Sequence, residues 1–439
     1  MTGGDPSLTG RQGDPRGLML LAGRAVVGID RFMAMAGALA MRLPDGPAAL
    51  NLCERRDNFL VALVALLIRG QACLLPPSRA PAVVAEVMEE HPGSYRLEDE
   101  LVEGSRDPAP ADRLRFPSIP SDRVVVVGYT SGSTGRPQPH PKTWGAFGAA
   151  MAFNASRIRE ALRPERTHSM PWILATVPPQ HMYGMELTVL LPLLGGVGVH
   201  AARPLYPADI AAALEELPGP RILVTTPVHL RALLQSSQPL PPLDVVVSAT
   251  APLDRDTAEA VERRHGAAVV EFFGSTETCV IASRRTACED AWRPYPGVTL
   301  QPAGTGTRVG APWFGSTVLL QDVLDLRDDG RFVVRGRNAD LVEVGGKRAS
   351  LGDLTRRLLA VPGVSDAIVF QLDRTEGAAV QRLAALVVAE GLTESQVLAA
   401  LGPAVDPVFL PRPLVLVRQL PRNEVGKLPR EQLLAALRH

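Results

Sequence analysis

The chain has 439 residues. From typical domain sizes, this length suffices for roughly three domains and a sizeable core. Lys and Arg number 46, as do Asp and Glu, so the formal net charge is +0. No block of like charge stands out, which argues against nucleic acid or an anionic membrane surface as a partner. The longest apolar run, 59–68, is too short for a membrane span and fits a buried helix better.

Residues 1–16 are rich in Gly, Pro and Asp and have no basic region leading into an apolar core. They do not resemble a secretory signal, and we expect a frayed start. The four cysteines, Cys53, Cys73, Cys279 and Cys288, show no metal-ligand spacing. In a chain of this size they indicate reduced thiols rather than a disulfide framework, which predicts a cytoplasmic protein.

Residues 18–120 alternate apolar helices with short strands. A helix is expected over 58–69, ending at Gly70, and a strand over 72–75, halted by two prolines. A helix that ends at glycine and is followed by a short strand is typical of an α/β layer. No catalytic constellation lies here, so we interpret the segment as scaffold.

A loop rich in glycine and hydroxyl groups follows the next predicted strand. Four valines at 124–127 are typical of a buried strand, which is expected to stop at Gly128. Residues 129–135, YTSGSTG, let N–H and O–H groups converge without obstruction by Cβ atoms. Such a nest suits a polyanion, and the alternative is a flexible linker. The following residues, 136–138 (RPQ), exclude a Walker loop, which needs Lys-Ser/Thr opening a helix.

The stretch YTSGSTGRP resembles the phosphate loop of the adenylate-forming superfamily, which includes acyl- and aryl-CoA synthetases, peptide-synthetase adenylation domains and beetle luciferases. The resemblance covers about residue 124 to the C-terminus. It implies that a carboxylate and Mg·ATP give an acyl-adenylate and pyrophosphate, and that the acyl group then passes to the thiol of CoA or of a carrier protein's phosphopantetheine. It assigns ATP binding in this loop to Thr130, Ser131, Gly132, Ser133, Thr134 and Gly135.

A helix over 144–162 and a strand over 173–177 are expected next, followed by PPQHMYGME. His181 and Tyr183 in this stretch resemble the family's segment that lines the carboxylate-substrate pocket. A lone histidine such as His181 is also typical of an ordinary hydrogen-bonded side chain. His181 and Tyr183, together with Cys279 and the small residues Ala249 and Gly304, would line a flat pocket, or equally a tunnel for an acyl chain.

Two further predicted strands carry the rest of the nucleotide site. One, within 243–253, ends in small residues, and one over 268–272 leads into FFGSTET. The resemblance assigns magnesium binding to Glu277. Mg²⁺ on a triphosphate requires a hard oxygen ligand of this kind. Gly-Ser-Thr-Glu by itself also fits a helix cap. The resemblance assigns adenine contacts to Thr250, Ala251 and Pro252, adenine stacking to Phe273, and contact with the α-phosphate to Thr276.

The ribose site and the hinge follow in the family's order. Asp322 lies eight residues before Gly330 of a DDG turn, the spacing of the family's ribose-binding aspartate. Arg337 matches the arginine that also meets the ribose, and Asp340 matches the hinge between two domains. Short Asp-Gly or Arg-Gly-Arg runs are uninformative alone, so their order carries the assignment.

Residues beyond the hinge predict a compact unit with helices over 351–360 and near 393–400, and strands near 367–372, 383–388 and 414–417. Its end resembles the family's loop that carries the adenylation lysine, here Lys427. A lysine in this position is otherwise typical of a solvated surface. We therefore predict an α/β fold: a large N-terminal domain of layered sheets and helices over 1–339, holding the ATP and carboxylate sites, and a small mobile α+β C-terminal domain over 340–439.

The sequence departs from the family at three places. Gln138 stands where a lysine is common, with Lys142 near enough to substitute; Glu343 stands where another lysine is common, and the GGKR that follows is one residue short. The alternative function is therefore a nucleotide-binding or regulatory protein that has kept the fold and lost turnover. PSRAP and PHPKTW resemble the short bacterial ligases of aryl-polyene pathways, which favours an aromatic or unsaturated acid.

Overall fold

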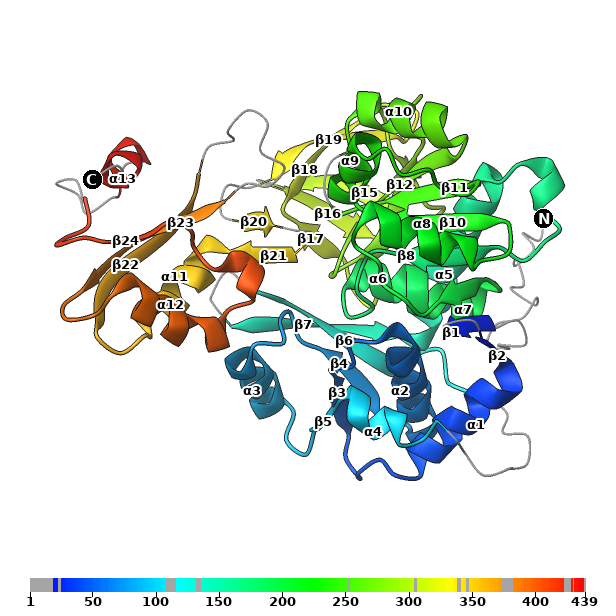
Figure 1. Cartoon of the computed structure of the whole chain (residues 1–439), viewed down its shortest axis with the longest axis horizontal. Helices are drawn as coiled ribbons and strands as arrows, with labels where there is room; N and C mark the ends of the chain where they lie inside the picture. Colours follow the sequence, from blue (N-terminus) through cyan, green and yellow to red (C-terminus); the bar gives the residue numbers. More distant parts are fainter. Residues whose placement is uncertain are drawn as a thin grey trace. The chain divides into compact units, whose positions relative to one another are not determined.

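The computed structural model describes residues 19–22, 25–106, 116–131, 136–250, 253–303, 306–337, 341–344, 347–372, 382–421, 428 and 430–437. Figure 1 shows a mixture of helices and strands, as the sequence predicts for an α/β protein. The chain divides into two compact units, one of residues 1–75, 93–128 and 140–337, the other of 76–92, 129–139 and 338–439. Because the second unit takes in two segments that precede residue 339, the predicted domain boundary at 339 stays a prediction.

The described part of the first unit is built on a nine-stranded sheet with the order β14-β13-β12-β11-β10-β8-β9-β1-β2. Strands β12 to β1 in this order are parallel, and β13, β14 and β2 are antiparallel at the edges. The strand bounds are β1 Met19–Ala22, β2 Ala25–Gly28, β8 Trp172–Ala175, β9 Gly198–His200, β10 Arg221–Thr225, β11 Val245–Ser248, β12 Ala268–Ser275, β13 Cys279–Arg284 and β14 Arg293–Pro294.

A second sheet has the order β5-β3-β4-β6-β7 among the described strands, and β5, β3, β4 and β6 are parallel. Two small sheets follow later in the chain, β15-β16-β17 and β18-β19. Their strands are β3 Ala48–Asn51, β4 Ala72–Leu75, β5 Tyr95–Leu97, β6 Val124–Ser131, β7 Pro137–Thr143, β15 Thr299–Ala303, β16 Gly306–Gly310, β17 Val318–Leu320, β18 Asp322–Leu326 and β19 Phe332–Arg337.

Both faces of the nine-stranded sheet are buried. In β11, Val245 and Val247 pack into one core cluster with α2 (Arg56–Arg69) and α5 (Trp144–Ala161), whereas Val246 packs into another with α10 (Arg255–His265). A parallel strand covered on both faces needs a continuous apolar run rather than alternation, which explains the VVV sequences. The other helices before residue 338 are α1 Ile29–Ala40, α3 Pro81–Glu90, α4 Asp99–Glu103, η1 Pro164–Arg166, α6 Met182–Met185, the π-helical η2 Glu186–Leu190, α7 Leu191–Gly195, α8 Pro207–Glu215 and α9 Pro227–Gln235.

The C-terminal residues of the second unit form their own core. Leu358 and Val397, from two helices, pack with Val369 and Val387 from two strands. The elements predicted there are confirmed to within a few residues. They are β20 Leu341–Val344, β21 Lys347–Ser350, α11 Leu351–Leu359, β22 Val364–Gln371, β23 Leu383–Ala389, α12 Glu394–Leu401, η3 Gly402–Ala404, η4 Pro407–Phe409, β24 Leu414–Leu416 and α13 Arg430–Ala436.

The helix predicted over 58–69 and the strand over 72–75 are confirmed as α2 and β4, and α2 ends at Gly70 with φ 73°. The expectation that the strand before the glycine-rich loop stops at Gly128 is wrong. That strand, β6, continues to Ser131, and residues 137–143 form β7 despite three prolines. β7 is the edge strand of its sheet, where a missing N–H need not break a ladder.

The start of α2 is anchored by a buried arginine. Arg56 is 1% exposed, and its guanidinium is surrounded by the backbone at the ends of β8 and β9. Burial, followed by the nearby charge of Arg203, lowers the pKa of Arg56 to about 9. Arg56 donates to the carbonyl oxygens of Ala175 (3.2 Å), Val177 (2.8 Å), His200 (2.9 Å) and Ala202 (2.6 Å).

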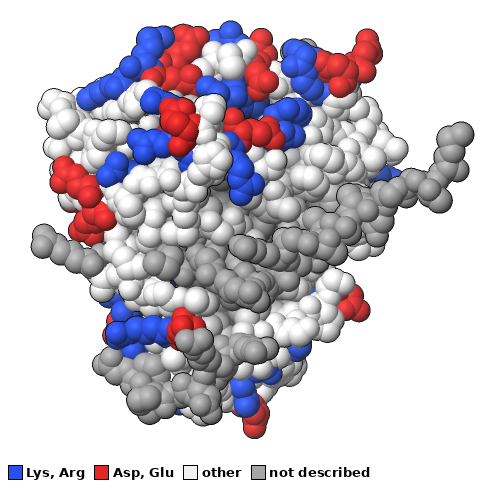
Figure 2. Space-filling view, turned by 90° about the vertical axis from the view of Figure 1, so that its right-hand side faces the viewer, with Lys and Arg blue, Asp and Glu red and all other residues white. Residues whose placement is uncertain are grey.

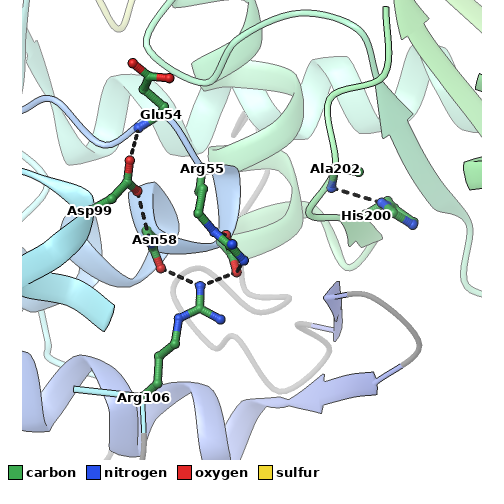
Figure 3. A network of polar contacts seen from close by, with 8 residues as sticks. Glu54, Arg55, Asn58, Asp99, Arg106, His200 and Ala202 are labelled. Atoms are coloured by element: carbon green, nitrogen blue, oxygen red, sulfur yellow. Dashed lines mark hydrogen bonds and ion pairs between the residues drawn. The ribbon is translucent and has the colours of Figure 1, made fainter. Parts of the chain in front are cut away.

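Further polar contacts tie the start of α2 to α4, as Figure 3 shows. Asp99 accepts from the backbone N–H of Glu54 and from Asn58 Nδ2, each at 2.8 Å. Arg106 donates to Asn58 Oδ1 at 2.6 Å and also pairs with Asp57. The loop that follows β3 is therefore fixed at the carboxyl end of its sheet.

Charges of both signs mix on the face drawn in Figure 2. They gather in the upper part of the view, at the height at which Figure 1 draws α10. That helix carries Arg263 and Glu259, which pair at 3.1 Å. The mixture agrees with the formal net charge of +0.

The cysteines and helices bear on two sequence expectations. Cys53, Cys73 and Cys279 are buried, Cys288 is exposed, and all four are thiols outside any disulfide, as expected. Within the described ranges, every helix is too short or too polar to cross a membrane.

We predict that Arg56→Ala destabilises the fold by about 3–5 kcal/mol, because it leaves buried carbonyl oxygens without their charged donor. The matched control is Arg263→Ala, which removes an exposed helical pair and is expected to change stability by less than about 0.5 kcal/mol. Urea unfolding of both variants measures the difference. Equal effects would contradict the anchoring role of Arg56.

Candidate active site

Glu277 lies in the turn of the β12–β13 hairpin. Ser275 and Cys279 face each other in the ladder, so residues 276–278 form a three-residue turn. Cys279 follows it with φ 60°, in the left-handed region that residues other than glycine rarely adopt. Gly274 is required here, since a Cβ would lie 2.1 Å from the Cys279 carbonyl oxygen. Backbone geometry therefore sets where Glu277 is presented.

Two buried charged side chains hold this hairpin. Lys142 of β7, 8% exposed, donates from Nζ to the carbonyl oxygen of Glu277. Glu186 of η2, 1% exposed, accepts the Val280 N–H with its two carboxylate oxygens at 3.2 and 3.0 Å. The hydroxyls of Ser275 and Thr278 bond to each other at 3.2 Å within the turn.

Glu186 belongs to a longer buried network. Asn154 Nδ2 donates to Glu186 Oε2 at 3.5 Å, and Tyr295 donates its hydroxyl to Asn154 Oδ1 at 2.7 Å. Burial raises the pKa of Glu186 to about 7, while the Val280 N–H and the charge of Lys142 oppose the rise. The π-helical turn that carries Glu186 is a feature often found at functional sites.

Three separated motifs meet beside this hairpin. A Cβ on Gly128 of β6 would lie 2.8 Å from Met182 Cε and 3.0 Å from Thr276 Cγ2. Gly128 directly precedes the glycine-rich stretch, and Met182 lies in the predicted acid-pocket segment. The absence of a side chain at residue 128 therefore lets the phosphate-loop strand, the acid segment and the Glu277 turn approach one another.

Thr250 lies at the carboxyl end of β11, in a parallel sheet whose strand ends are the usual place for ligands. Its φ is 80°, in the left-handed region that a β-branched residue rarely adopts. Its buried hydroxyl has no hydrogen-bond partner among the described residues. Strained, unpartnered groups of this kind are found at ligand sites, which supports the predicted adenine contact.

The predicted pocket residues Tyr183, Ala249 and Cys279 lie in one buried cluster. Tyr183 donates its hydroxyl to the carbonyl oxygens of Thr225 at 3.2 Å and Val247 at 3.0 Å, so it ties two strand ends together. Burial raises the pKa of the Tyr183 hydroxyl and of the Cys279 thiol, which keeps both neutral. His181 is half-buried and directly precedes α6.

The two predicted ribose residues are brought together. Asp322, buried at the start of β18, lies directly opposite Arg337 of β19 in the antiparallel ladder. This pairing is one of backbone positions. The pairing agrees with a shared role at one ribose.

The Phe273 ring is packed against other aromatic rings and is not freely accessible for stacking. It packs against Trp292 and Phe332 with centroid distances of 5.4 and 5.3 Å. These contacts fix the ring at the end of β12. Adenine stacking on Phe273 stays a prediction.

Several predicted residues lie outside the described ranges: Gly132, Ser133, Thr134, Gly135, Ala251, Pro252, Gly304, Asp340 and Lys427. Ser131 and Arg337 are described by their backbone alone, and Thr130 is half-buried in β6. Gln138 is exposed in β7, and Glu343 of β20 lies opposite Arg348 of β21. Lys142, proposed to replace the missing lysine, contacts the Glu277 turn.

The possible ligands in the described residues fit a nucleotide-bound Mg²⁺ better than a resident metal ion. The described His, Cys, Asp and Glu residues contain no group of three or more that could hold a metal ion. Nucleotide-bound Mg²⁺ takes only one or two protein carboxylates and draws its remaining ligands from phosphates and water. One carboxylate at Glu277 beside the Thr276 hydroxyl fits that requirement and does not fit a resident metal.

A separate cavity of about 400 Å³ lies at the start of α2. None of the predicted site residues lines it. Its wall belongs to the Arg56 network: Glu54, Arg55, Arg56, Asp57, Ala201, Ala202 and Arg203.

Sequence reasoning missed the network of Glu186, Asn154 and Tyr295. One signal was present, because Glu186 is the only charged residue in the apolar stretch 182–194. A carboxylate in such a stretch must be buried with partners, since an unpaired buried charge is very unfavourable. Asn154 and Tyr295 carry no comparable signal.

Comparison with protein families gives one matching model, described as AMP-binding enzyme, over residues 66–339. The match includes the glycine-rich loop, the PPQHMYGME segment and FFGSTET. It therefore covers the motifs that the structure brings together around Gly128 and Glu277.

Two proteins named as CoA ligases are similar to this chain in sequence. The chain is 31% identical over 309 residues to a 4-coumarate–CoA ligase of Halorhodospira halophila, covering 68% of this chain and 73% of that protein. It is 27% identical over 453 residues to a 4-chlorobenzoate–CoA ligase of Pseudomonas, covering 93% and 84%.

Solved structures show the same fold. A double mutant of o-succinylbenzoate CoA synthetase from Bacillus subtilis matches with a TM-score of 0.79 and 18% identity over 96% of each chain. An amide bond synthetase from Marinactinospora thermotolerans matches with a TM-score of 0.76 and 18% identity, covering 96% of this chain and 97% of that one.

The raised pKa of Glu186 predicts a pH-dependent stability. Folding favours the protonated form, so the wild type loses stability as pH rises from the unfolded pKa near 4.5 to about 7. Glu186→Gln cannot ionise, so its stability relative to the wild type should rise by about 3 kcal/mol across that window and then level off. Thermal melts between pH 5 and 8 measure the difference.

The control for this pH series is Glu160→Gln. The Glu160 carboxylate is half exposed, and its contacts with Arg157 and Arg293 lower its pKa against the opposing effect of burial. This variant should therefore gain no stability as pH rises. A constant difference between Glu186→Gln and the wild type would refute the buried, proton-holding state of Glu186.

Proposed function

This chain belongs to the AMP-binding enzyme family, and we propose that it is an AMP-forming ligase that activates a carboxylic acid with ATP and transfers the acyl group to a thiol. The family match over residues 66–339 is the observation that carries this proposal. Relatives named 4-coumarate–CoA ligase and 4-chlorobenzoate–CoA ligase support CoA as the acceptor. A carrier protein's phosphopantetheine is the other acceptor to test.

The chemistry requires positioning more than a covalent enzyme nucleophile. A carboxylate is a poor electrophile because its leaving group would be oxide, and the adenylate supplies a better one. The protein must hold the acid in line with the α-phosphorus and stabilise charge on the transferring oxygens. Thr276 and Lys427 are the proposed groups at the α-phosphate, and the glycine-rich loop that follows β6 is the proposed holder of the other phosphates.

Mg²⁺ bound with ATP would neutralise phosphate charge, with Glu277 as its protein ligand. Lys142 donates to the carbonyl oxygen of Glu277, so this contact is made with the backbone of the turn and not with the Glu277 carboxylate. The strained Thr250 backbone would meet adenine, and the opposed Asp322 and Arg337 would meet the ribose. These roles follow from the match of each residue to the family's motifs.

We propose an aromatic acid as the substrate. The relatives named for coumarate and chlorobenzoate ligation support a flat acid, and Tyr183, Ala249 and Cys279 are the residues proposed to line its pocket. An unsaturated acyl chain is the alternative occupant of this pocket. The four free thiols fit a reducing compartment, so we propose the cytoplasm as its location.

The competing function is a nucleotide-binding protein without turnover. ATP–pyrophosphate exchange, measured with a panel of aromatic and unsaturated acids, separates the two. Acid-dependent exchange supports the ligase, whereas ATP binding without exchange supports the competitor.

We predict that Glu277→Gln abolishes Mg-dependent adenylation and leaves the fold intact, because the change is nearly isosteric and removes the charge that the metal needs. ATP–pyrophosphate exchange measures the loss, and a thermal melt controls for folding. Exchange at a near wild-type rate would disprove the role of Glu277 as metal ligand.

Lys427→Ala is expected to lower adenylation by at least about 10²-fold, because a preorganised cation stabilises charge in the in-line transition state. Thioester formation from supplied acyl-adenylate should survive. Asp340→Pro restricts φ at the hinge and should have the reverse effect, sparing adenylation and blocking transfer. Loss of the same half-reaction in both variants would refute alternation between two domain arrangements.

A further inference from the structure

We propose that Glu186 is a positioning residue that fixes the hairpin presenting Thr276 and Glu277, acting as the buried acceptor for the Val280 N–H. The inference rests on the proposed function, because Glu277 is the metal ligand only within it. Glu186 itself is 1% exposed and is assigned no contact with substrate. Its effect on catalysis would therefore pass through the backbone of the hairpin.

The hairpin needs an external restraint. Cys279 has φ 60°, and Gly274 comes so close to the Cys279 carbonyl that no side chain fits there. The register of the ladder also shifts between Phe273 and Gly274, next to Val280. Such a backbone persists only when its surroundings hold it in place.

Glu186 supplies this restraint where the register of the ladder shifts. Both carboxylate oxygens lie within 3.2 Å of the Val280 nitrogen, one residue after Cys279. Glu186 is itself held by Asn154, which Tyr295 holds in turn. The carboxylate is therefore oriented by a chain of fixed side chains and is not free to follow the hairpin.

Lys142 fixes the other part of the same turn, through the carbonyl oxygen of Glu277. Glu186 holds the Val280 N–H and Lys142 holds the Glu277 carbonyl oxygen, so Thr278 and Cys279 lie between two tethered peptide groups and Glu277 directly precedes them. Removing one tether leaves the carboxylate of Glu277 attached to a backbone that can move. Partners of this indirect kind typically change metal affinity by about 10–100-fold.

Two substitutions separate hydrogen bonding from charge. Glu186→Leu fills a similar volume without an acceptor, whereas Glu186→Gln keeps an acceptor oxygen and removes the charge. We expect Glu186→Leu to weaken Mg·ATP binding by about 10–100-fold and to speed amide hydrogen exchange in residues 275–284. Glu186→Gln should stay within about threefold of the wild type in both measurements. Calorimetry with Mg·ATP and no acid provides a readout that does not depend on turnover.

The matched control is Glu271→Gln, in the same strand β12. Glu271 is 2% exposed and pairs with Arg284 at 2.6 Å, so its substitution also disturbs a buried carboxylate. It should lower thermal stability without changing the Mg²⁺ dependence of nucleotide binding. The control therefore shows how much of any effect is general destabilisation.

The outcomes decide between the possibilities. The proposal is overturned if Glu186→Leu melts at lower temperature but keeps wild-type Mg·ATP affinity and exchange protection, or if Glu186→Gln fails as badly as the leucine variant. If the leucine variant does not fold, retained affinity and protection in Glu186→Gln support the acceptor role, and their loss overturns it. If Glu277→Gln instead shows normal ATP–pyrophosphate exchange, the proposed metal role of Glu277 is wrong. The role of Glu186 is then judged by amide hydrogen exchange alone.

Discussion

The close approach of the backbone at Gly274 to the Cys279 carbonyl is the constraint from which the site is built. A Cβ at residue 274 would lie 2.1 Å from that oxygen, so the hairpin can exist only with glycine there. The same tight turn forces Cys279 to φ 60° and directs Glu277 away from the ladder. A second absent side chain, at Gly128, lets Thr276 approach the strand that leads to the glycine-rich loop.

Main-chain groups bind two buried ionisable side chains of the first unit. Arg56 donates to four carbonyl oxygens, and Glu186 accepts a peptide N–H. An ion pair would bind one side chain to another, whereas these contacts bind a side chain directly to strand ends and turns. This arrangement suits a site whose geometry is set by backbone, because the charge acts on the element that has to be held.

Local signals predicted the elements that depend on local causes. The VVV runs predict β6 and β11 because strands covered on both faces need continuous apolar residues. The same reasoning fails for β7, whose prolines are tolerated only because it is an edge strand, and edge position is a property of the whole sheet. The contact of Glu186 with Val280 spans 94 residues and that of Lys142 with Glu277 spans 135. Neither partner can be inferred from periodicity or spacing.

A site with one metal-binding carboxylate depends on its backbone more than a site with several. Where phosphates and water supply most ligands of Mg²⁺, the protein would control the ion through the orientation of Glu277, if Glu277 is the ligand as proposed. Cys279 ends the turn that carries Glu277 and is buried in the same core as Tyr183 and Ala249. If the acid binds beside Cys279, as proposed, it would therefore act on the backbone that presents Glu277, without any contact between the acid and the metal.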